Sequence, residues 1–325
     1  MQSRAEGTTG LARGTGGAGG EEYAQQDRYD WLWEEYLRAF PAIALENIRA
    51  GCHPRRMIHK TAERAVVLVH GLSDSPLFMQ AIGLYFHEIL GYNVYLPLLP
   101  CHGLKDPRLM AGVTLAEWKR SVRFAVLAAG AGGTRVSVGG FSLGGILSLY
   151  MACTEEAVAG ELYLFAAALG LAPGFGPFCG IKEFLLRLPF AERFDSGEPL
   201  IGDNPYRYSR VCLNGAVELV RLIGEVDGML RKSGVILPRR RIFAAWSEYD
   251  QVVCLKKLRK LQRLAGDGRY AGFVIPAGSR VDHASLVLAE PIFPENARPG
   301  QAPLEPANPF FREMVAAMGR FAAGG

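Results

Sequence analysis

The sequence predicts an α/β fold built on a doubly wound, mostly parallel sheet. Between residues 65 and 275, short β-branched runs alternate with longer segments of helical periodicity. This alternation is typical of a parallel sheet with helices on both faces. A length of 325 residues and a hydrophobic content of 49% suit one large domain with a sizeable core and an insertion. We expect that domain to span residues 21–325.

The first 20 residues are rich in glycine and small polar residues. They cannot bury enough apolar surface to offset chain entropy, so we expect residues 1–20 to form a disordered tail. Gly14, Gly16 and Gly19 match GxGxxG, but without a preceding strand or a closely following helix they do not predict a dinucleotide site. The segment lacks the apolar core of a secretory signal, and we expect a soluble, cytoplasmic protein.

The expected elements follow in order along the chain. An aromatic face at helical spacing predicts a helix over residues 23–40. Strands are expected at residues 65–69, 92–98, 135–139, 162–166, 241–246 and 270–275. Helices are expected at residues 76–90, 114–129, after residue 142, and at 210–232, 255–264 and 310–321. The proline-rich residues 291–309 should be irregular.

Two of these helices carry start signals. Pro76 suits the first turn of a helix, because proline has no backbone N–H to leave unsatisfied. Thr114 and Glu117 have the spacing of a capping box, in which each side chain bonds the backbone N–H of the other.

A serine lies between a predicted strand and a predicted helix, in the segment Gly140–Gly144, which reads GFSLG and fits GxSxG. A nucleophilic serine must project from a tight turn, and small residues two positions before and after it leave room for that turn. The helix start then offers backbone N–H groups to negative charge. Ser142 is therefore the candidate nucleophile, and a glycine turn set by packing alone is the alternative.

A serine hydroxyl needs a base to accept its proton. In doubly wound hydrolases the chain order is serine, then acid, then histidine. His283 is the only one of the six histidines that follows Ser142, and it lies beyond the last predicted strand. We therefore predict that His283 is the base.

The acid should follow the strand at residues 241–246. Glu248 and Asp250 both do, and we favour Asp250. Asp282 is the neighbour of His283 in sequence, and adjacent side chains usually diverge, so we expect it on the surface. The acid would hold the imidazole in one tautomer and stabilise its charged form.

The backbone should supply two donors to a developing oxyanion. One comes from the residue after the nucleophile and the other from the loop after the first core strand. That loop reads HGLSDSP over residues 70–76. The amides of Leu72 and Leu143 are the predicted pair, and Gly71 lets the backbone approach closely.

Five segments together resemble a known family: AVVLVHGLSDSP, GYNVYLPLLPCHG, GGFSLGG, SEYDQVV and DHASL. In this order, over residues 60–290, the chain resembles the α/β-hydrolase group of bacterial carboxylesterases and monoacylglycerol lipases. The resemblance implies hydrolysis of carboxylic esters of short to medium acyl chains through an acyl-enzyme. It also implies a small cap and no cofactor. The family's nucleophile, acid and base map onto Ser142, Asp250 and His283, whereas Cys101 departs from the glycine usual in relatives.

Two other functions stay open at this point. The same three residues could hydrolyse acyl-thioesters. Alternatively, the fold could serve as a non-catalytic ligand-binding protein or scaffold, because a fold does not determine its function.

Residues 170–205 interrupt the alternation of strands and helices. Glycines and prolines cluster there among large apolar side chains, and we interpret the segment as an inserted cap. Phe175, Phe178 and Phe184 are candidate substrate-binding residues that would roof an apolar acyl pocket. Completion of the core by these side chains is an equally good alternative.

Charge and cysteine usage limit the partners. A net charge of +4 does not predict nucleic-acid binding. The basic helix at residues 255–264 could contact an anionic surface or an acyl carrier, although a solvated face is the more frequent explanation. Six dispersed cysteines indicate free thiols in a reducing compartment. The Cys-His pairs at 52–53 and 101–102 lack further ligands, so we predict no metal site.

Overall fold

One sheet organises the part of the chain that the computed structural model describes, residues 31–131, 133–172, 201–232, 240–266 and 268–324. Seven strands lie there in the order β1-β3-β2-β4-β5-β6-β7. β1 is antiparallel to β3, and every other neighbouring pair is parallel. The strands are β1 (Arg55–Met57), β2 (Arg64–Val69), β3 (Asn93–Leu96), β4 (Arg135–Phe141), β5 (Leu162–Phe165), β6 (Ile242–Ser247) and β7 (Tyr270–Ile275). The predicted fold class is confirmed.

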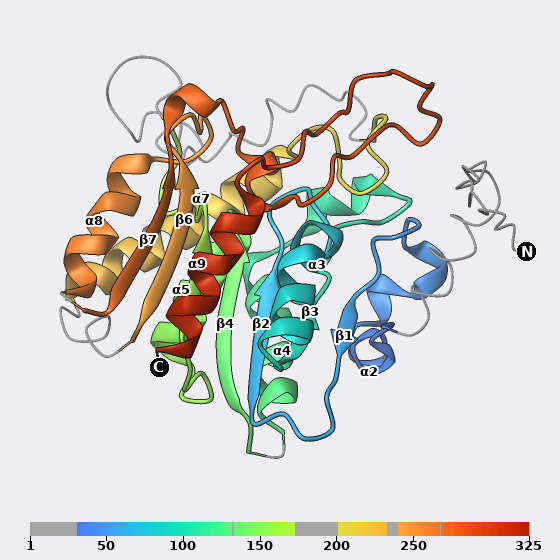
Figure 1. Cartoon of the computed structure of the whole chain (residues 1–325). Coiled ribbons are helices and arrows are strands. Elements are labelled where there is room, and N and C mark those ends of the chain that lie inside the picture. The colour runs from blue at the N-terminus through green and yellow to red at the C-terminus, as the bar shows by residue number, and fades with distance from the viewer. Residues whose placement is uncertain (1–30, 132, 173–200, 233–239, 267, 325) are drawn as a thin grey trace, which may run out of the picture.

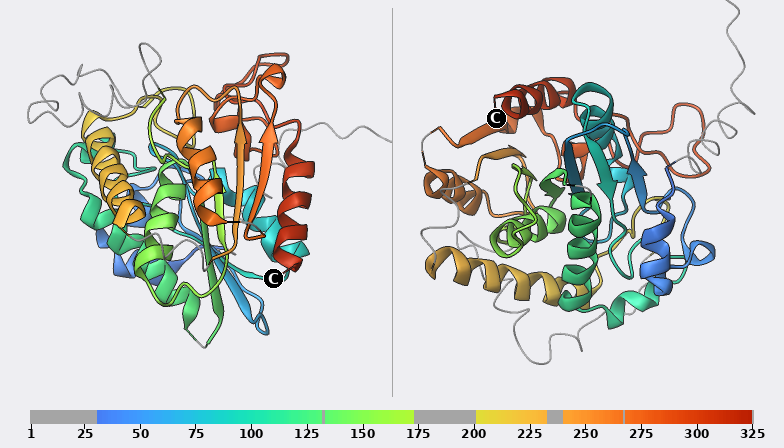
Figure 2. Two further views of the ribbon diagram at one scale, coloured as in Figure 1. Left: turned by 90° about the vertical axis from the view of Figure 1, so that its left-hand side faces the viewer. Right: turned by 90° about the horizontal axis from the view of Figure 1, so that it is seen from below.

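Helices cover both faces of the sheet. α3 and α9 lie on one face, α4 and α5 lie on the other, and α7 packs outside α4 and α5 (Figure 1, Figure 2). The α-helices are α2 (Glu34–Ala39), α3 (Leu77–Leu84), α4 (Leu115–Gly130), α5 (Leu143–Thr154), α7 (Leu213–Lys232), α8 (Leu255–Ala265) and α9 (Phe311–Ala323). Short 3₁₀ segments are η1 (Pro41–Ile43), η2 (Leu45–Asn47), η4 (Pro107–Gly112), η7 (Ala277–Ser279) and η8 (Ala284–Val287).

The central strands are buried on both faces. Every residue of β5 and all but the first residue of β2 and β4 are buried. Strands covered by helices on both sides need continuous apolar runs instead of alternating ones, and AVVLV in β2 is such a run.

The predicted capping box at the start of α4 is also present. Thr114 Oγ1 accepts from the backbone N–H of Glu117, and the Glu117 carboxylate accepts from the backbone N–H of Thr114.

The structure corrects three expectations about local elements. Within the described residues, the N-terminal helix begins only at Glu34, because Leu32 forms a β-bridge with Arg55. The predicted helix over 76–90 changes from α to π geometry at η3 (Tyr85–Ile89). β1 was not predicted, since three residues reading RRM show no periodicity and the strand depends on its pairing with β3.

Some expectations fall where the structure describes nothing. The tail at residues 1–20 and residues 173–200 of the predicted cap, with Phe175, Phe178 and Phe184, lie outside the described residues.

Residues 291–309 contain no helix or strand, as expected, and an isolated bridge joins Ile292 to Glu305. Among the described helices, none combines the length and the apolar character needed to cross a membrane.

Candidate active site

The parallel sheet brings four sequence-distant loops to one edge. Val69 at the end of β2 pairs with Gly140 of β4, and Phe141 pairs with Phe165 of β5. Ser247 and Ile275 pair at the ends of β6 and β7. The loops that follow β2, β4, β6 and β7 therefore leave the sheet at its carboxyl edge, where ligands bind in open α/β sheets.

Ser142 lies in a strained turn between β4 and α5. Its backbone has φ 53° and ψ −113°, which L-residues rarely adopt. The conformation is held from both sides: its N–H donates to Phe165 O at 3.0 Å, and its carbonyl accepts from Ala168 N at 3.0 Å. Such a conformation costs about 1–3 kcal/mol and persists only where the surrounding structure imposes it. Ser142 is buried with only 7% of its surface exposed, whereas the residues on either side of it, Phe141 and Leu143, are 1% and 0% exposed.

Glycine is required on both sides of this serine. A Cβ on Gly140 would lie 2.5 Å from the carbonyl carbon of Gly144, and a Cβ on Gly144 would lie 1.9 Å from Val69 O. The start of α5 thus rests directly on the ends of β2 and β4. The two glycines of the sequence pattern are the residues that permit this close approach.

We expect Gly144→Ala to lower the free energy of unfolding by about 3 kcal/mol or more, because its methyl group would meet backbone that cannot move aside. Urea denaturation would measure the change. Gly228→Ala in α7 is the matched control, since a Cβ there meets nothing within 4 Å. It should raise the stability by up to about 1 kcal/mol, the difference in helix propensity. Equal effects of the two substitutions would contradict the packing argument.

Asp250 and His283 are in direct contact. The Asp250 Oδ2 to His283 Nδ1 distance is 2.6 Å, with the two side chains 1% and 12% exposed. Asp250 Oδ1 accepts from the backbone N–H groups of Val252 at 2.7 Å and Val253 at 3.1 Å. These bonds fix the carboxylate, and the carboxylate places a proton on Nδ1. The other ring nitrogen is then left to accept a proton.

The imidazole also lies beside the turn that carries the serine. The rings of His283 and Phe141, the residue before Ser142, have centroids 4.7 Å apart. The other two carboxylates considered for the acid point elsewhere. Glu248 pairs with Arg259 at 2.9 Å, and Asp282 is exposed.

The loop after β2 holds its peptide groups in fixed directions. His70 Nε2 accepts from Leu99 N at 3.0 Å, so the ring proton is on Nδ1 and donates to Gly71 O at 2.8 Å. Burial, with His102 nearby, lowers the pKa of His70 well below its ordinary value, so the ring is neutral. Asp74 N also donates to Gly71 O, at 3.2 Å.

Those bonds orient the Leu72 amide. The carbonyl of Gly71 and the N–H of Leu72 belong to one trans peptide and point in opposite directions. Two donors on the Gly71 oxygen therefore aim the Leu72 N–H the other way. No role was predicted for His70, although it directly precedes Gly71 in the sequence. The amide of Leu143 belongs to the first residue of α5, where N–H groups lack partners within the helix.

The model of a family described as "Alpha/beta hydrolase family" matches residues 66–323. The chain belongs to the alpha/beta hydrolase family. The family predicted from the sequence motifs is thereby confirmed.

Solved structures share the fold of this chain at low identity. The monoacylglycerol lipase of Paleococcus ferrophilus is 15% identical, with a TM-score of 0.58 over 84% of this chain and 99% of the lipase. A soluble variant of the monoglyceride lipase of Saccharomyces cerevisiae is 12% identical, with a TM-score of 0.58 over 84% and 90%. A structure from the metagenome-derived lipolytic enzymes LipS and LipT is 21% identical, with a TM-score of 0.55 over 72% and 93%.

Cys101, at the position where the resemblance implied a glycine, keeps a glycine-like backbone. Cys101 has φ 65°, a left-handed conformation that costs an L-residue about 1–2 kcal/mol. The Tyr208 hydroxyl donates to Cys101 O at 3.1 Å and holds the turn. Burial raises the pKa of the Cys101 thiol to about 11, so this side chain stays a neutral thiol.

The positive charge of the basic helix α8 is partly neutralised by ion pairs. Leu258 and Leu261 are buried against the core. Lys257 pairs with Asp227 at 2.9 Å, and Arg259 pairs with Glu248. Lys256, Lys260 and Arg263 are exposed. Contact of this helix with an anionic surface or acyl carrier stays a prediction.

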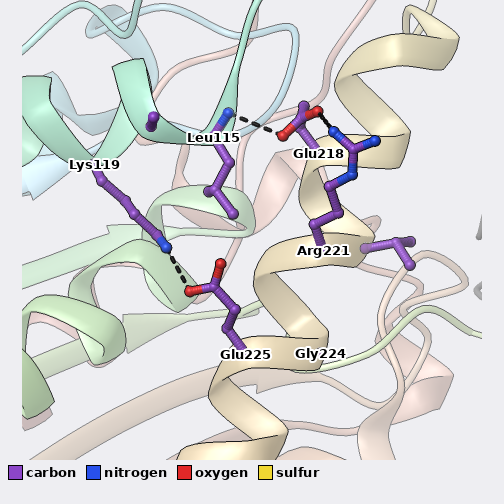
Figure 3. A pocket seen from close by; sticks show the side chains of 8 residues that line it. Leu115, Lys119, Glu218, Arg221, Gly224 and Glu225 are labelled. Carbon is purple, nitrogen blue, oxygen red and sulfur yellow. Dashed lines mark hydrogen bonds and ion pairs between the residues drawn. The ribbon is translucent and has the colours of Figure 1, made fainter.

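A pocket of about 690 Å³ lies elsewhere, between α4 and α7. Its charged side chains point at one another (Figure 3). Lys119 reaches Glu225 at 2.5 Å, and Glu218 pairs with Arg221 and accepts from Leu115 N at 3.0 Å. None of the predicted site residues lines this pocket, so it is separate from the candidate active site.

Proposed function

We propose that the chain is a serine hydrolase that cleaves carboxylic esters through an acyl-enzyme. Ser142 is the nucleophile, His283 the base and Asp250 the acid that orients it. The observation that carries the proposal is the strained serine at the start of α5, in a turn whose Phe141 packs on the imidazole that Asp250 bonds at 2.6 Å. A structural serine would have no need of this costly backbone or of an oriented histidine beside it.

The proposed reaction has two steps. As Ser142 Oγ attacks the ester carbonyl carbon, His283 Nε2 takes the hydroxyl proton. The carbonyl oxygen becomes an oxyanion that accepts from the N–H groups of Leu72 and Leu143. The C–O bond to the alcohol then breaks, and His283 gives the alcohol its proton. Water repeats the sequence on the acyl-enzyme, releasing the carboxylic acid and restoring Ser142.

A fluorophosphonate probe tests the proposal directly. The probe phosphonylates only a serine whose hydroxyl is activated by a base, so we expect one modified residue, Ser142, when the labelled protein is digested and mapped. His283→Ala should abolish the labelling. An unlabelled Ser142 in the folded protein would favour the scaffold alternative. A panel of p-nitrophenyl esters and acyl-thioesters would then separate ester from thioester hydrolysis.

The substrate proposal concerns acyl length. Fold relatives carry the names of monoacylglycerol lipases and lipolytic enzymes, and we propose an apolar acyl pocket beside Ser142, roofed by Phe175, Phe178 and Phe184. Each methylene that enters it should contribute up to about 0.8 kcal/mol to transition-state binding. The value of kcat/KM should rise with chain length from acetyl and then reach a plateau.

Removing bulk from the roof should move that plateau. Phe178→Ala or Phe184→Ala should extend or shorten the preferred chain, while turnover of the acetyl ester serves as the internal control. A flat chain-length profile that neither substitution changes would contradict the pocket and leave the catalytic proposal intact.

A further inference from the structure

Three charged side chains meet at the edge of the candidate active site. Asp74 belongs to the loop after β2, Arg207 to the segment before α7, and Glu305 to the proline-rich stretch. Arg207 Nε lies 3.2 Å from Asp74 Oδ1, and Arg207 Nη1 lies 2.7 Å from Glu305 Oε1. The guanidinium also lies 5.6 Å from the centre of the Phe78 ring. One arginine thus joins three segments that are distant in sequence.

The Asp74 carboxylate folds back over Gly71, in the loop that carries the Leu72 amide. Its Oδ2 would lie 2.3 Å from a Cβ on Gly71, and the Phe141 ring would lie 3.0 Å from the same point. Phe141 in turn packs on His283. Asp74 is therefore a second carboxylate on the imidazole side of the site, in addition to Asp250, which bonds Nδ1.

The charges that face Asp74 act in opposite directions. Its side chain is 1% exposed, and this burial raises the pKa of Asp74 to about 6. The positive charges of Arg207 and of protonated His283 favour the ionised form, whereas Glu305 opposes it. At neutral pH Asp74 is ionised. The attraction between its charge and a protonated His283 is mutual, so it also favours the charged form of the imidazole.

We propose that Asp74 is a positioning residue for the reaction, whose negative charge stabilises the imidazolium that His283 becomes when it takes the proton of Ser142. Arg207 holds the carboxylate in place and keeps it charged. The inference rests on the proposed function of Ser142 and His283. It differs from the role of Asp250, because Asp74 acts through its charge across the contact between the Phe141 and His283 rings, without a hydrogen bond to Nδ1.

The burial of Asp74 makes the stability of the fold depend on pH. The folded-state pKa of Asp74 lies above its unfolded value of 3.8. The stability it contributes is present below about pH 4 and is lost as pH rises through about 6. Ionised Asp74 is thus tolerated at neutral pH at a cost in stability. An electrostatic role in the reaction would explain why a carboxylate that lowers stability lies beside a proposed catalytic base.

The test is Asp74→Asn, which removes the charge and nearly preserves the shape. We expect kcat/KM on its neutral plateau to fall about tenfold, the effect of one nearby charge in a protein interior. The acid limb of the kcat/KM profile should move to lower pH, because the imidazole then loses a negative neighbour that favours its protonation. Circular dichroism at pH 7.5 should show that the variant is folded.

Glu161→Gln is the matched control. Glu161 is also a buried carboxylate, bonded to Arg135 at 3.0 Å and to Ser137, but it lies at the amino end of β5, at the opposite edge of the sheet. Glu161→Gln should lower the Tm and leave the pH profile of kcat/KM unchanged. If the folded Asp74→Asn variant leaves the acid limb unmoved, Asp74 is structural and the inference is wrong. A wild-type chain that neither labels at Ser142 nor hydrolyses any ester would overturn both proposals.

Discussion

Replacing Ser142 by alanine is expected to lower kcat for ester hydrolysis by about 10⁴- to 10⁶-fold, and His283→Ala by a similar factor. Either substitution removes the transfer of a proton from Oγ to the imidazole, on which nucleophilic attack depends. The double variant should be no slower than the single ones, because the two residues act as one unit. Steady-state kinetics on a p-nitrophenyl ester would measure all three.

The control for these variants is Ser148→Ala. Ser148 is a buried serine of the same helix, and its hydroxyl donates to Gly144 O at 2.7 Å. It should retain most of the wild-type kcat. Circular dichroism and Tm should show that Ser142→Ala and His283→Ala are folded. If Ser142→Ala retains wild-type turnover in a folded protein, the nucleophile has been assigned wrongly.

The second large effect is expected for Asp250→Asn, which should lower kcat by about 10⁴-fold. The backbone bonds from Val252 and Val253 keep an asparagine side chain in place. Its amide group can then donate to Nδ1, which moves the ring proton to the nitrogen that should accept from Ser142. The loss therefore comes from the wrong tautomer, with the fold intact.

Two carboxylates near Asp250 in sequence or space provide the comparison. Glu248→Gln breaks only a surface pair with Arg259, and Asp282→Asn changes an exposed side chain. Both should keep kcat close to that of the wild type, since exposed pairs contribute little. If Asp250→Asn is nearly silent while one of these two is strongly impaired, the acid has been assigned wrongly.

Features set by short-range interactions could be predicted from the sequence. The run AVVLV predicted β2, and Thr114 with Glu117 predicted the start of α4, because periodicity and capping involve residues only a few positions apart. The turn around Ser142 was predicted for the same reason, since its two glycines lie within five residues. The order of motifs along the chain then predicted the family.

Features set by contacts between distant segments needed the tertiary structure. Three carboxylates were candidates for the partner of His283, and only the packing of the loops after β6 and β7 brings Asp250 to 2.6 Å from Nδ1. The bond from Leu99 N to His70 Nε2, and the approach of Arg207 to Asp74, likewise had no signal in the sequence. An isolated arginine in a loop belongs to no periodic pattern. Its partners are determined by which loops the folded sheet brings next to it. The sequence by itself thus determined the fold class and the candidate nucleophile, whereas the surroundings of the base were decided by tertiary packing between residues more than 30 positions apart.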